Sequence, residues 1–284
     1  MTRQYIQHRI RKRDGSWRIL YEPNPELKRF QRRLLRDLQR RVSWPVYVTG
    51  FVPGRSIRHN AAYHVSSRYI LSLDLKDFFP SITSGMVAMA LVLHGLATPS
   101  DAQDITYWCT LDGVLPQGAP TSPFLSNLVF SFLDSELARY CAKRGLVYTR
   151  YADDITISGT YIDAKVILPE LDRCIRSMGF SLNYAKTRLV GKNKCARVTG
   201  ITVVTRLNAP RKLINRVRGN LHKLRLAYAN NPNLTYADVP SIIGVSLFTL
   251  GGWVSFIYSI DPSTPYKSQY DAIVQLLQHG PVGP

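Results

Sequence analysis

Two adjacent aspartates interrupt a stretch of this 284-residue chain that otherwise has the composition of a β-strand. Residues 149–158 read TRYADDITIS, so Asp153 and Asp154 have aromatic and β-branched residues on both sides. Aspartate is disfavoured within strands, whereas a hairpin tip accepts it readily. The pattern therefore predicts two strands, over residues 146–152 and 155–158, joined by a turn that carries both acids. An ordinary surface turn would explain these ten residues equally well.

A third carboxylate follows an earlier strand-like run. In SRYILSLDLKDFFPSI, residues 67–82, the alternation places Ile70, Ser72 and Asp74 on one face of a strand. A strand end fixes the backbone of a carboxylate and leaves its oxygens open to an ion, and a two-metal site requires several converging carboxylates. Asp74, Asp153 and Asp154 are therefore candidates for one cation site, and the alternative for the hairpin pair is an ordinary Asp-containing turn.

The rest of the chain alternates helical patterns with short strand-like pieces. Helices are expected to start near Ser56 and Pro210 and to cover residues 26–41, 83–94, 100–109, 124–145 and 164–178. Short strands are expected within residues 180–191 and 196–204. This order favours an α+β fold, a sheet-bearing core with helical additions on both sides.

The positive charge is concentrated in two blocks. Residues 1–60 hold 15 Lys and Arg against 4 Asp and Glu, and residues 206–225 hold 7 against none, which together account for the net charge of +18. A solvated basic surface would be the simplest explanation. Two basic blocks that flank a neutral middle favour a groove for a polyanion, and nucleic acid is preferred over a membrane surface because phosphate contacts give sequence-independent affinity.

Two features bear on the compartment. The cysteines, Cys109, Cys141, Cys174 and Cys195, are widely spaced and form no zinc-binding pattern, which favours a reduced, cytoplasmic setting. Residues 242–260 contain no charge and reach the length of a membrane span. Glycine, serine and threonine dilute this segment, so a buried helix pair or a bent helix is preferred and no membrane partner is expected.

Three motifs in order resemble the palm of reverse transcriptases: SLDLKDFFPSI, LPQGAPTSPFLSN and YADD. The resemblance runs from about residue 11 to residue 260 and implies a right-hand polymerase fold. Fingers would cover residues 1–70, with 83–115 partly a fingers or palm insertion; the palm, with an antiparallel sheet bearing the YADD hairpin, would cover 71–205 and a helical thumb 206–284. The resemblance implies an RNA-directed DNA polymerase.

The resemblance also implies roles for individual residues. Asp74 and Asp153 would be the main ligands of two Mg²⁺ ions, assisted by the backbone carbonyl of Leu75, with Asp154 as a neighbouring carboxylate. Phe79 matches the steric gate that favours deoxynucleotides, while Phe78 better suits the core. The remaining positions that match dNTP-binding residues are Lys12, Arg18, Gln117, Gly118 and Lys186.

Two short stretches narrow the resemblance to retron reverse transcriptases. NAAYH fits an Asn-Ala-x-x-His signature at Asn60 and His64, and VTG fits a second signature at Val198, Thr199 and Gly200. The likeness implies that the enzyme binds its own structured non-coding RNA, primes from a guanosine 2′-hydroxyl and makes a branched RNA–DNA hybrid. It also implies antiphage defence with an effector protein.

A basic helical segment in the expected thumb is the natural RNA-binding element, although a solvated thumb helix is the alternative. Its candidate residues are Arg211, Lys212, Arg216, Arg218, Lys223 and Arg225. LGGWVSFIYSIDP further on resembles a thumb helix of these families, but lacks their customary basic residue. Two other functions stay open: an RNA-binding scaffold that neutralises a partner in a defence complex, and another type of reverse transcriptase, group II-like or template-independent.

Overall fold

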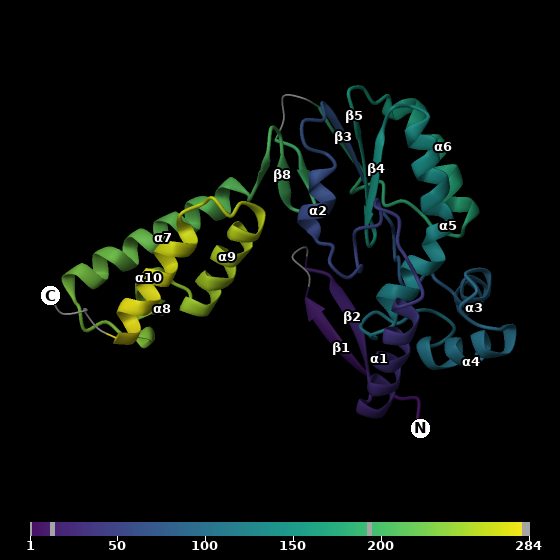
Figure 1. Ribbon diagram of the computed structural model, residues 1–284, viewed down its shortest axis with the longest axis horizontal. Coiled ribbons are helices and arrows are strands. Elements are labelled where there is room, and N and C mark those ends of the chain that lie inside the picture. Colours follow the sequence, from purple (N-terminus) through teal and green to yellow (C-terminus); the bar gives the residue numbers. More distant parts are fainter. Residues whose placement is uncertain (1, 12–14, 192–194, 280–284) are drawn as a thin grey trace. The chain divides into compact units, whose positions relative to one another are not determined.

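The computed structural model describes residues 2–11, 15–191 and 195–279. The chain forms two compact units, Met1–Lys194 and Cys195–Pro284. Helices and antiparallel strands are mixed in both units (Figure 1), so the α+β class is confirmed. The boundaries expected for fingers, palm and thumb stay predictions, because a division into two units does not separate fingers from palm.

The first unit is centred on a four-stranded antiparallel sheet with the order β4-β5-β3-β6. Its strands are β3 (Tyr69–Asp74), β4 (Val147–Tyr151), β5 (Asp154–Gly159) and β6 (Arg188–Val190). The predicted strand pair around the two aspartates is present, with its second strand starting one residue earlier than expected, at Asp154. Because β3 lies between β5 and β6, the strand that ends at Asp74 is central and almost entirely buried.

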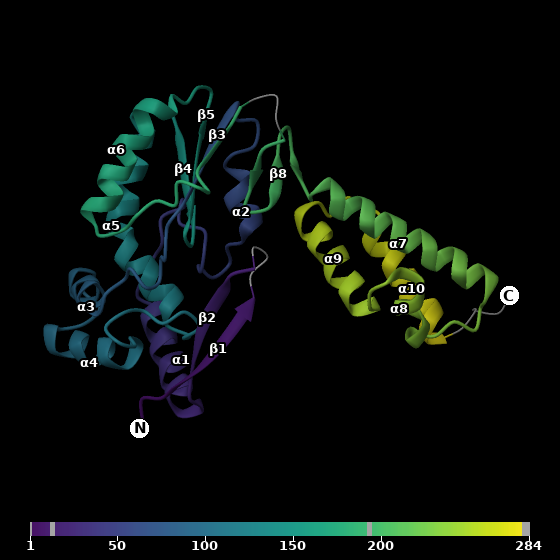
Figure 2. The ribbon, with the colours of Figure 1, turned by 180° about the vertical axis from the view of Figure 1, so that it is seen from behind.

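Helices cover this sheet and supply most of the core. The long helix α5 (Ser122–Ala142) packs on β4 and on α6 (Ala164–Ser177), as Figures 1 and 2 show beside the sheet. Leu125, Leu128 and Leu133 of α5 are fully buried together with Leu71 of β3. Burial of this apolar surface supplies the main driving force for folding of the unit.

The first unit also contains an N-terminal hairpin and further helices. Strands β1 (Tyr5–Arg11) and β2 (Trp17–Pro23) pair in antiparallel register and are followed by α1 (Pro25–Gln39), which starts at the capping residue Asn24. Helices α3 (Ser84–Leu93) and α4 (Pro99–Cys109) pack on each other. The hairpin was not expected, because most of its residues are exposed and its apolar residues, such as Ile6, Ile10 and Trp17, do not face a core.

The second unit contains a small sheet and a helical bundle. Strands β7 (Arg197–Val198), β8 (Ile201–Val203) and β9 (Leu207–Asn208) precede α7 (Arg211–Asn230), a short 3₁₀ turn (Tyr236–Asp238), α8 (Val239–Ile243), α9 (Leu247–Ile260) and α10 (Tyr266–His279). The expected bent helix pair is present as α8 and α9. No single helix of the described residues is long and apolar enough to cross a membrane, whereas Tyr236–Ile243 and Leu247–Ile260 reach that length only together, with a bend of 73°.

A buried polar network joins the short helix α2 (Ile57–Ala62) and the residues after it to the central sheet. His64 has no exposed surface, and its ring nitrogens lie 2.7 Å from the hydroxyls of Ser158 on β5 and Thr149 on β4. Asn60, also fully buried, accepts from the Thr49 hydroxyl at 2.9 Å. Buried polar groups of this kind fix one arrangement of the elements that they join, because breaking the bonds leaves them unsatisfied.

This burial makes folding sensitive to acid. Burial lowers the pKa of His64 from 6.5 to about 4, so between these values the unfolded chain binds more protons than the folded chain. The contribution of His64 to the free energy of unfolding is full above about pH 6.5 and is lost as the pH drops toward 4, a change on the order of 3 kcal/mol. Urea unfolding of His64→Gln should show a shallower loss between pH 6.5 and 4 than the unchanged protein. Equal slopes for the two proteins would contradict this role.

Candidate active site

Three carboxylates meet at one end of the central sheet. Asp74 ends β3 and pairs in register with Asp154, the first residue of β5. Asp153 lies in the turn before it, and its backbone carbonyl accepts from the N–H of Leu75 at 3.1 Å. The preceding residue, Ala152, has the left-handed φ of +58° that L-residues seldom adopt. The fold therefore brings the three predicted aspartates together, although Asp74 is about 80 residues from the other two in the sequence.

Crowding shifts the titration of the pair in the hairpin. Burial raises the pKa of Asp153, and the neighbouring Asp74 raises it further, while Lys186 and Arg18 act in the opposite direction. Desolvation by surrounding atoms raises the pKa of Asp154 to about 6, with added repulsion from Asp153 and Asp74. Asp154 is nevertheless exposed to solvent, so the surrounding atoms enclose its carboxylate on one side only. Such like-charge clusters are typical of sites that bind a cation.

Lys186 supplies a positive charge to this cluster. Its ammonium lies 2.9 and 3.1 Å from the two carboxylate oxygens of Asp74, and its side chain is otherwise 60% exposed. The hydrogen bond to Asp74 raises the pKa of Lys186. The sequence indicated a place for Lys186 near the incoming nucleotide, which stays a prediction, and did not indicate this direct ion pair with Asp74.

The donor chemistry fits a divalent cation, although the described residues do not form a preassembled cage of three or more metal-binding side chains. Carboxylate and carbonyl oxygens are the ligands that hard divalent ions prefer. The Leu75 N–H is bonded to the Asp153 carbonyl, so the backbone at Leu75 lies beside the turn that carries the acids.

Aromatic residues form one border of the site. Phe79 is half-buried and its ring lies 6.2 Å from that of Phe51, which in turn lies 6.5 Å from Tyr151 next to the hairpin turn. Phe78 is buried among Phe130 and Phe180. The expectation that Phe78 belongs to the core is therefore confirmed, and Phe79 is left with a partly accessible ring.

The loop that carries Gln117 and Gly118 packs on the N-terminal hairpin. The Tyr21 N–H of β2 donates to the Gln117 carbonyl at 2.8 Å. Gly118 has a φ of +116°, and a Cβ at this position would lie 3.0 Å from the Tyr21 carbonyl, so the contact requires glycine. Arg18, on the same strand, is exposed and lowers the pKa of Asp153, which places its charge within electrostatic reach of the acids. Lys12 lies outside the described residues.

The two signature stretches are built into the framework. Asn60 and His64 are fully buried in the polar network between α2 and the central sheet, so their side chains do not present a surface to RNA. Thr199 and Gly200 both have positive φ and form the two-residue turn between β7 and β8, as type I′ hairpins require, while Val198 is buried.

The basic residues predicted on α7 all reach solvent. They are Arg211, Lys212, Arg216, Arg218, Lys223 and Arg225. The opposite face of the helix, with Val217, Leu221 and Leu224, is buried in the second unit. Arg216 also lies over the ring of Trp253 on α9, at 5.2 Å from the ring centre.

Sequence reasoning missed one group of buried residues beside the hairpin. Arg150, Asp134 and Asn127 are fully buried and bonded to one another. The only signal was an arginine within a β-rich run, at a position where the strand alternation directs its side chain to the core. Since Arg150 also bonds to the backbone of Ala152, this group is part of the support of the hairpin turn.

Comparison with known proteins gives the same assignment as the motifs. A family model described as reverse transcriptase (RNA-dependent DNA polymerase) matches residues 10–203. The retron Mx65 reverse transcriptase of Myxococcus xanthus is 40% identical over 244 residues, which are 78% of this chain and 56% of that protein. The retron Ec86 reverse transcriptase of Escherichia coli is 33% identical over 247 residues, 86% of this chain and 72% of that protein. The chain thus spans little more than half the length of the Mx65 protein.

Solved structures of telomerase share the fold. The Candida albicans enzyme, in complex with a fragment of telomeric RNA, superposes with a TM-score of 0.55 over 96% of this chain and 55% of that chain, at 10% identity. A Candida tropicalis telomerase gives a TM-score of 0.54 over 98% of this chain and 53% of its own, at 13% identity. These likenesses confirm the expected right-hand polymerase fold.

The family match over the unit that holds the three aspartates, and the retron relatives that extend beyond it, confirm the predicted resemblance: the chain belongs to the reverse transcriptase (RNA-dependent DNA polymerase) family, among its retron members.

Proposed function

We propose that this protein is an RNA-directed DNA polymerase that copies part of its own structured non-coding RNA. Synthesis would start from a guanosine 2′-hydroxyl and give a branched RNA–DNA hybrid. The observation that carries the proposal is the meeting of Asp74, Asp153 and Asp154 at one sheet end in a chain of this family. The protein would act in the cytoplasm, within an antiphage system that includes an effector protein.

Asp74, Asp153 and the Leu75 carbonyl would hold two Mg²⁺ ions, with Asp154 beside them. When bound, such ions stabilise the attacking and leaving oxygens of phosphoryl transfer. The side chain of Asp74 would then bind the metal in place of Lys186. The ammonium of Lys186 would become free to neutralise charge on the nucleotide. Arg18, together with Lys12, would hold the triphosphate.

The remaining nucleotide contacts follow from the border of the site. The partly accessible ring of Phe79 would exclude a ribose 2′-hydroxyl. Gln117 and Gly118, held on β2 by the Tyr21 backbone, would support the incoming dNTP. In the second unit, the exposed basic face of α7 would contact the phosphates of the RNA, where shape and backbone contacts dominate recognition.

Loss of one proposed ligand should abolish synthesis without unfolding the protein. Asp153→Asn keeps the size of the side chain but removes its charge, so primer extension on poly(rA)·oligo(dT) with Mg²⁺ should fall by more than about 100-fold. Asp104→Asn, an exposed position on α4, is the matched control and should retain full activity. Equal activity of all three proteins would refute the proposed mechanism.

Opening the gate should relax discrimination between sugars. Phe79→Val removes the ring and should raise the use of ribonucleotides relative to deoxynucleotides by roughly 10-fold or more, since a steric contact of this size discriminates on that order. The ratio of kcat/KM for rNTP and dNTP measures the effect. Phe132→Val, at an exposed phenylalanine of α5, should leave the ratio unchanged. An unchanged ratio in Phe79→Val would place the ring outside the nucleotide site.

Reversing the charge of α7 should weaken RNA binding. Replacement of Arg211, Lys212, Arg216 and Arg218 by glutamate should reduce affinity for co-purifying RNA. It should also flatten the dependence of log K on log salt by roughly one for each phosphate that the helix no longer binds. The same net change made at Arg139, Lys143, Lys165 and Arg173, which are exposed along α5 and α6, is the control. Equal losses of RNA affinity in both variants would contradict a specific role of α7, because net charge alone would then account for binding.

A further inference from the structure

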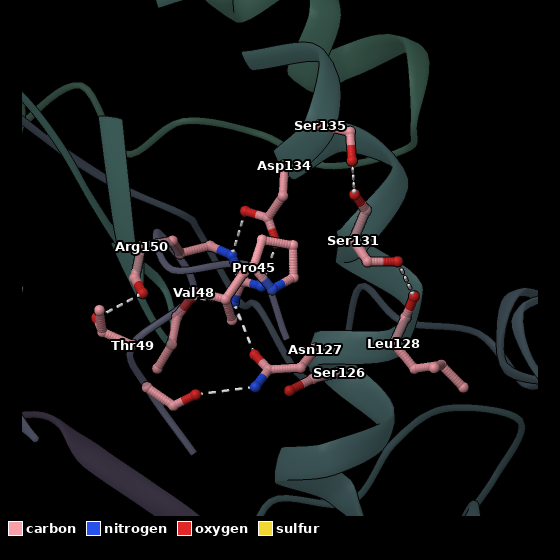
Figure 3. A network of polar contacts seen from close by, with 12 residues as sticks. Pro45, Val48, Thr49, Ser126, Asn127, Leu128, Ser131, Asp134, Ser135 and Arg150 are labelled. Carbon is pink, nitrogen blue, oxygen red and sulfur yellow. Dashed lines mark hydrogen bonds and ion pairs between the residues drawn. The ribbon is translucent and has the colours of Figure 1, made fainter. Parts of the chain in front are cut away.

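A fully buried ion pair lies directly behind the hairpin turn. Figure 3 shows Asp134 and Asn127 pointing from α5 toward Arg150 of β4. The Arg150 guanidinium donates to both oxygens of Asp134, at 2.8 and 2.6 Å, and stands 4.6 Å from the centre of the Phe130 ring. Burial disfavours the charge of Arg150, but the Asp134 carboxylate outweighs it and raises the pKa of the guanidinium. Tyr148 adds a fourth member, because its hydroxyl donates to Asp134 at 2.6 Å.

One guanidinium nitrogen reaches beyond the ion pair to the turn itself. Nη1 of Arg150 donates to the Asn127 side-chain oxygen at 3.0 Å and to the backbone carbonyl of Ala152 at 3.1 Å. Ala152 is the residue with the left-handed φ of +58°, and its carbonyl belongs to the peptide group that leads into Asp153. The contact with Arg150 therefore fixes the orientation of that peptide group.

A second contact holds the turn from the other side. Asn127 donates through its amide nitrogen to the Gly50 carbonyl at 2.8 Å. A Cβ on Gly50 would lie 2.4 Å from the Ala152 nitrogen, so the loop backbone touches the turn directly. Asn127 thus ties the loop at Gly50 and the side chain of Arg150 to the same point of α5, and Ala152 is enclosed between them.

The bonding pattern exceeds what packing alone requires. A buried ion pair is seldom more stabilising than apolar residues of the same volume. A lysine could neutralise Asp134, but only the planar guanidinium can bind both carboxylate oxygens and also reach a third and a fourth acceptor. The arrangement is therefore matched to the geometry of the turn.

We propose that Arg150, fixed by Asp134 and Asn127, is a positioning residue for polymerisation: it holds the left-handed turn at Ala152 and thereby the orientation of Asp153. The inference rests on the proposed role of Asp153 and deepens it. Arg150 does not touch the nucleotide and acts only through the backbone of the turn.

The test compares two substitutions within the same buried cluster. Arg150→Lys keeps the charge opposite Asp134 but gives up the planar set of donors that reaches Ala152. Tyr148→Phe, the matched control, removes a bond to the same carboxylate and leaves the contact between Arg150 and Ala152 in place. Primer extension on poly(rA)·oligo(dT), the thermal midpoint Tm and Mn²⁺ binding by electron paramagnetic resonance are measured for each protein.

Arg150→Lys should lose kcat on the order of 10- to 100-fold, as expected for a displacement near 1 Å, with KM for dTTP within about twofold. Its Mn²⁺ affinity should fall several-fold. Tyr148→Phe should lower Tm while kcat and Mn²⁺ affinity stay at the values of the unchanged protein. If kcat and Mn²⁺ affinity of Arg150→Lys stay unchanged, or if both variants lose activity in proportion to Tm, the cluster is merely structural and the proposal fails.

A paired substitution covers the case in which Arg150→Lys does not fold. Arg150→Met with Asp134→Leu removes both charges together, so that no unpaired charge is left in the core. This variant should fold, with the same loss of kcat and of Mn²⁺ affinity, and full activity would overturn the proposal. The proposed function is judged separately. It holds if the unchanged protein is active and Asp153→Asn is inactive, whatever the Arg150 variants show.

Discussion

Repulsion among three carboxylates at one end of a sheet is the constraint that the surrounding structure has to meet. Asp74 of β3 pairs with Asp154 of β5, and Asp153 lies in the turn between β4 and β5. Burial raises the pKa of both hairpin aspartates and repulsion from the neighbouring acids raises it further, so the cluster is costly without a cation. Lys186 offsets part of this cost by its ion pair with Asp74. In a metal-bound state Asp74 would bind the cation, and Lys186 would need a different partner.

Rigid surroundings keep these charges together. Strand β4 is bonded on both of its faces: Arg150 is held by α5 on one side, and Thr149 by His64 on the other. Both sets of contacts are buried, where an unsatisfied polar group is expensive and a fully bonded one fixes a single geometry. The two networks therefore serve one purpose, which is to hold a hairpin whose tip would otherwise relax away from its neighbour.

The sequence predicted the parts of this site that carry a local signature. Residues 149–158 indicated a hairpin, and the alternation around Asp74 indicated a strand, so both elements and their acids were expected. It could not predict that the strands pair with Asp74 opposite Asp154, because register between distant segments depends on tertiary packing.

Buried polar residues were the main gap. Arginine and aspartate usually lie at the surface. Only the folded chain shows that Arg150 and Asp134 bond to each other in the core. His64 was noted as part of a signature, yet the sequence did not distinguish a surface role from the buried contacts that it makes. The N-terminal hairpin was missed for a different reason, because its apolar residues, such as Ile6, Ile10 and Trp17, are exposed and do not mark a core-facing side.

The direct measurement is a crystal structure with template–primer, Mn²⁺ and a non-reactive dNTP analogue, in which anomalous scattering locates the ions. The account predicts two anomalous peaks bounded by Asp74, Asp153 and the Leu75 carbonyl, with Lys186 released from Asp74 and close to the nucleotide. Peaks elsewhere, or a Lys186 that still pairs with Asp74 beside a bound nucleotide, would contradict it.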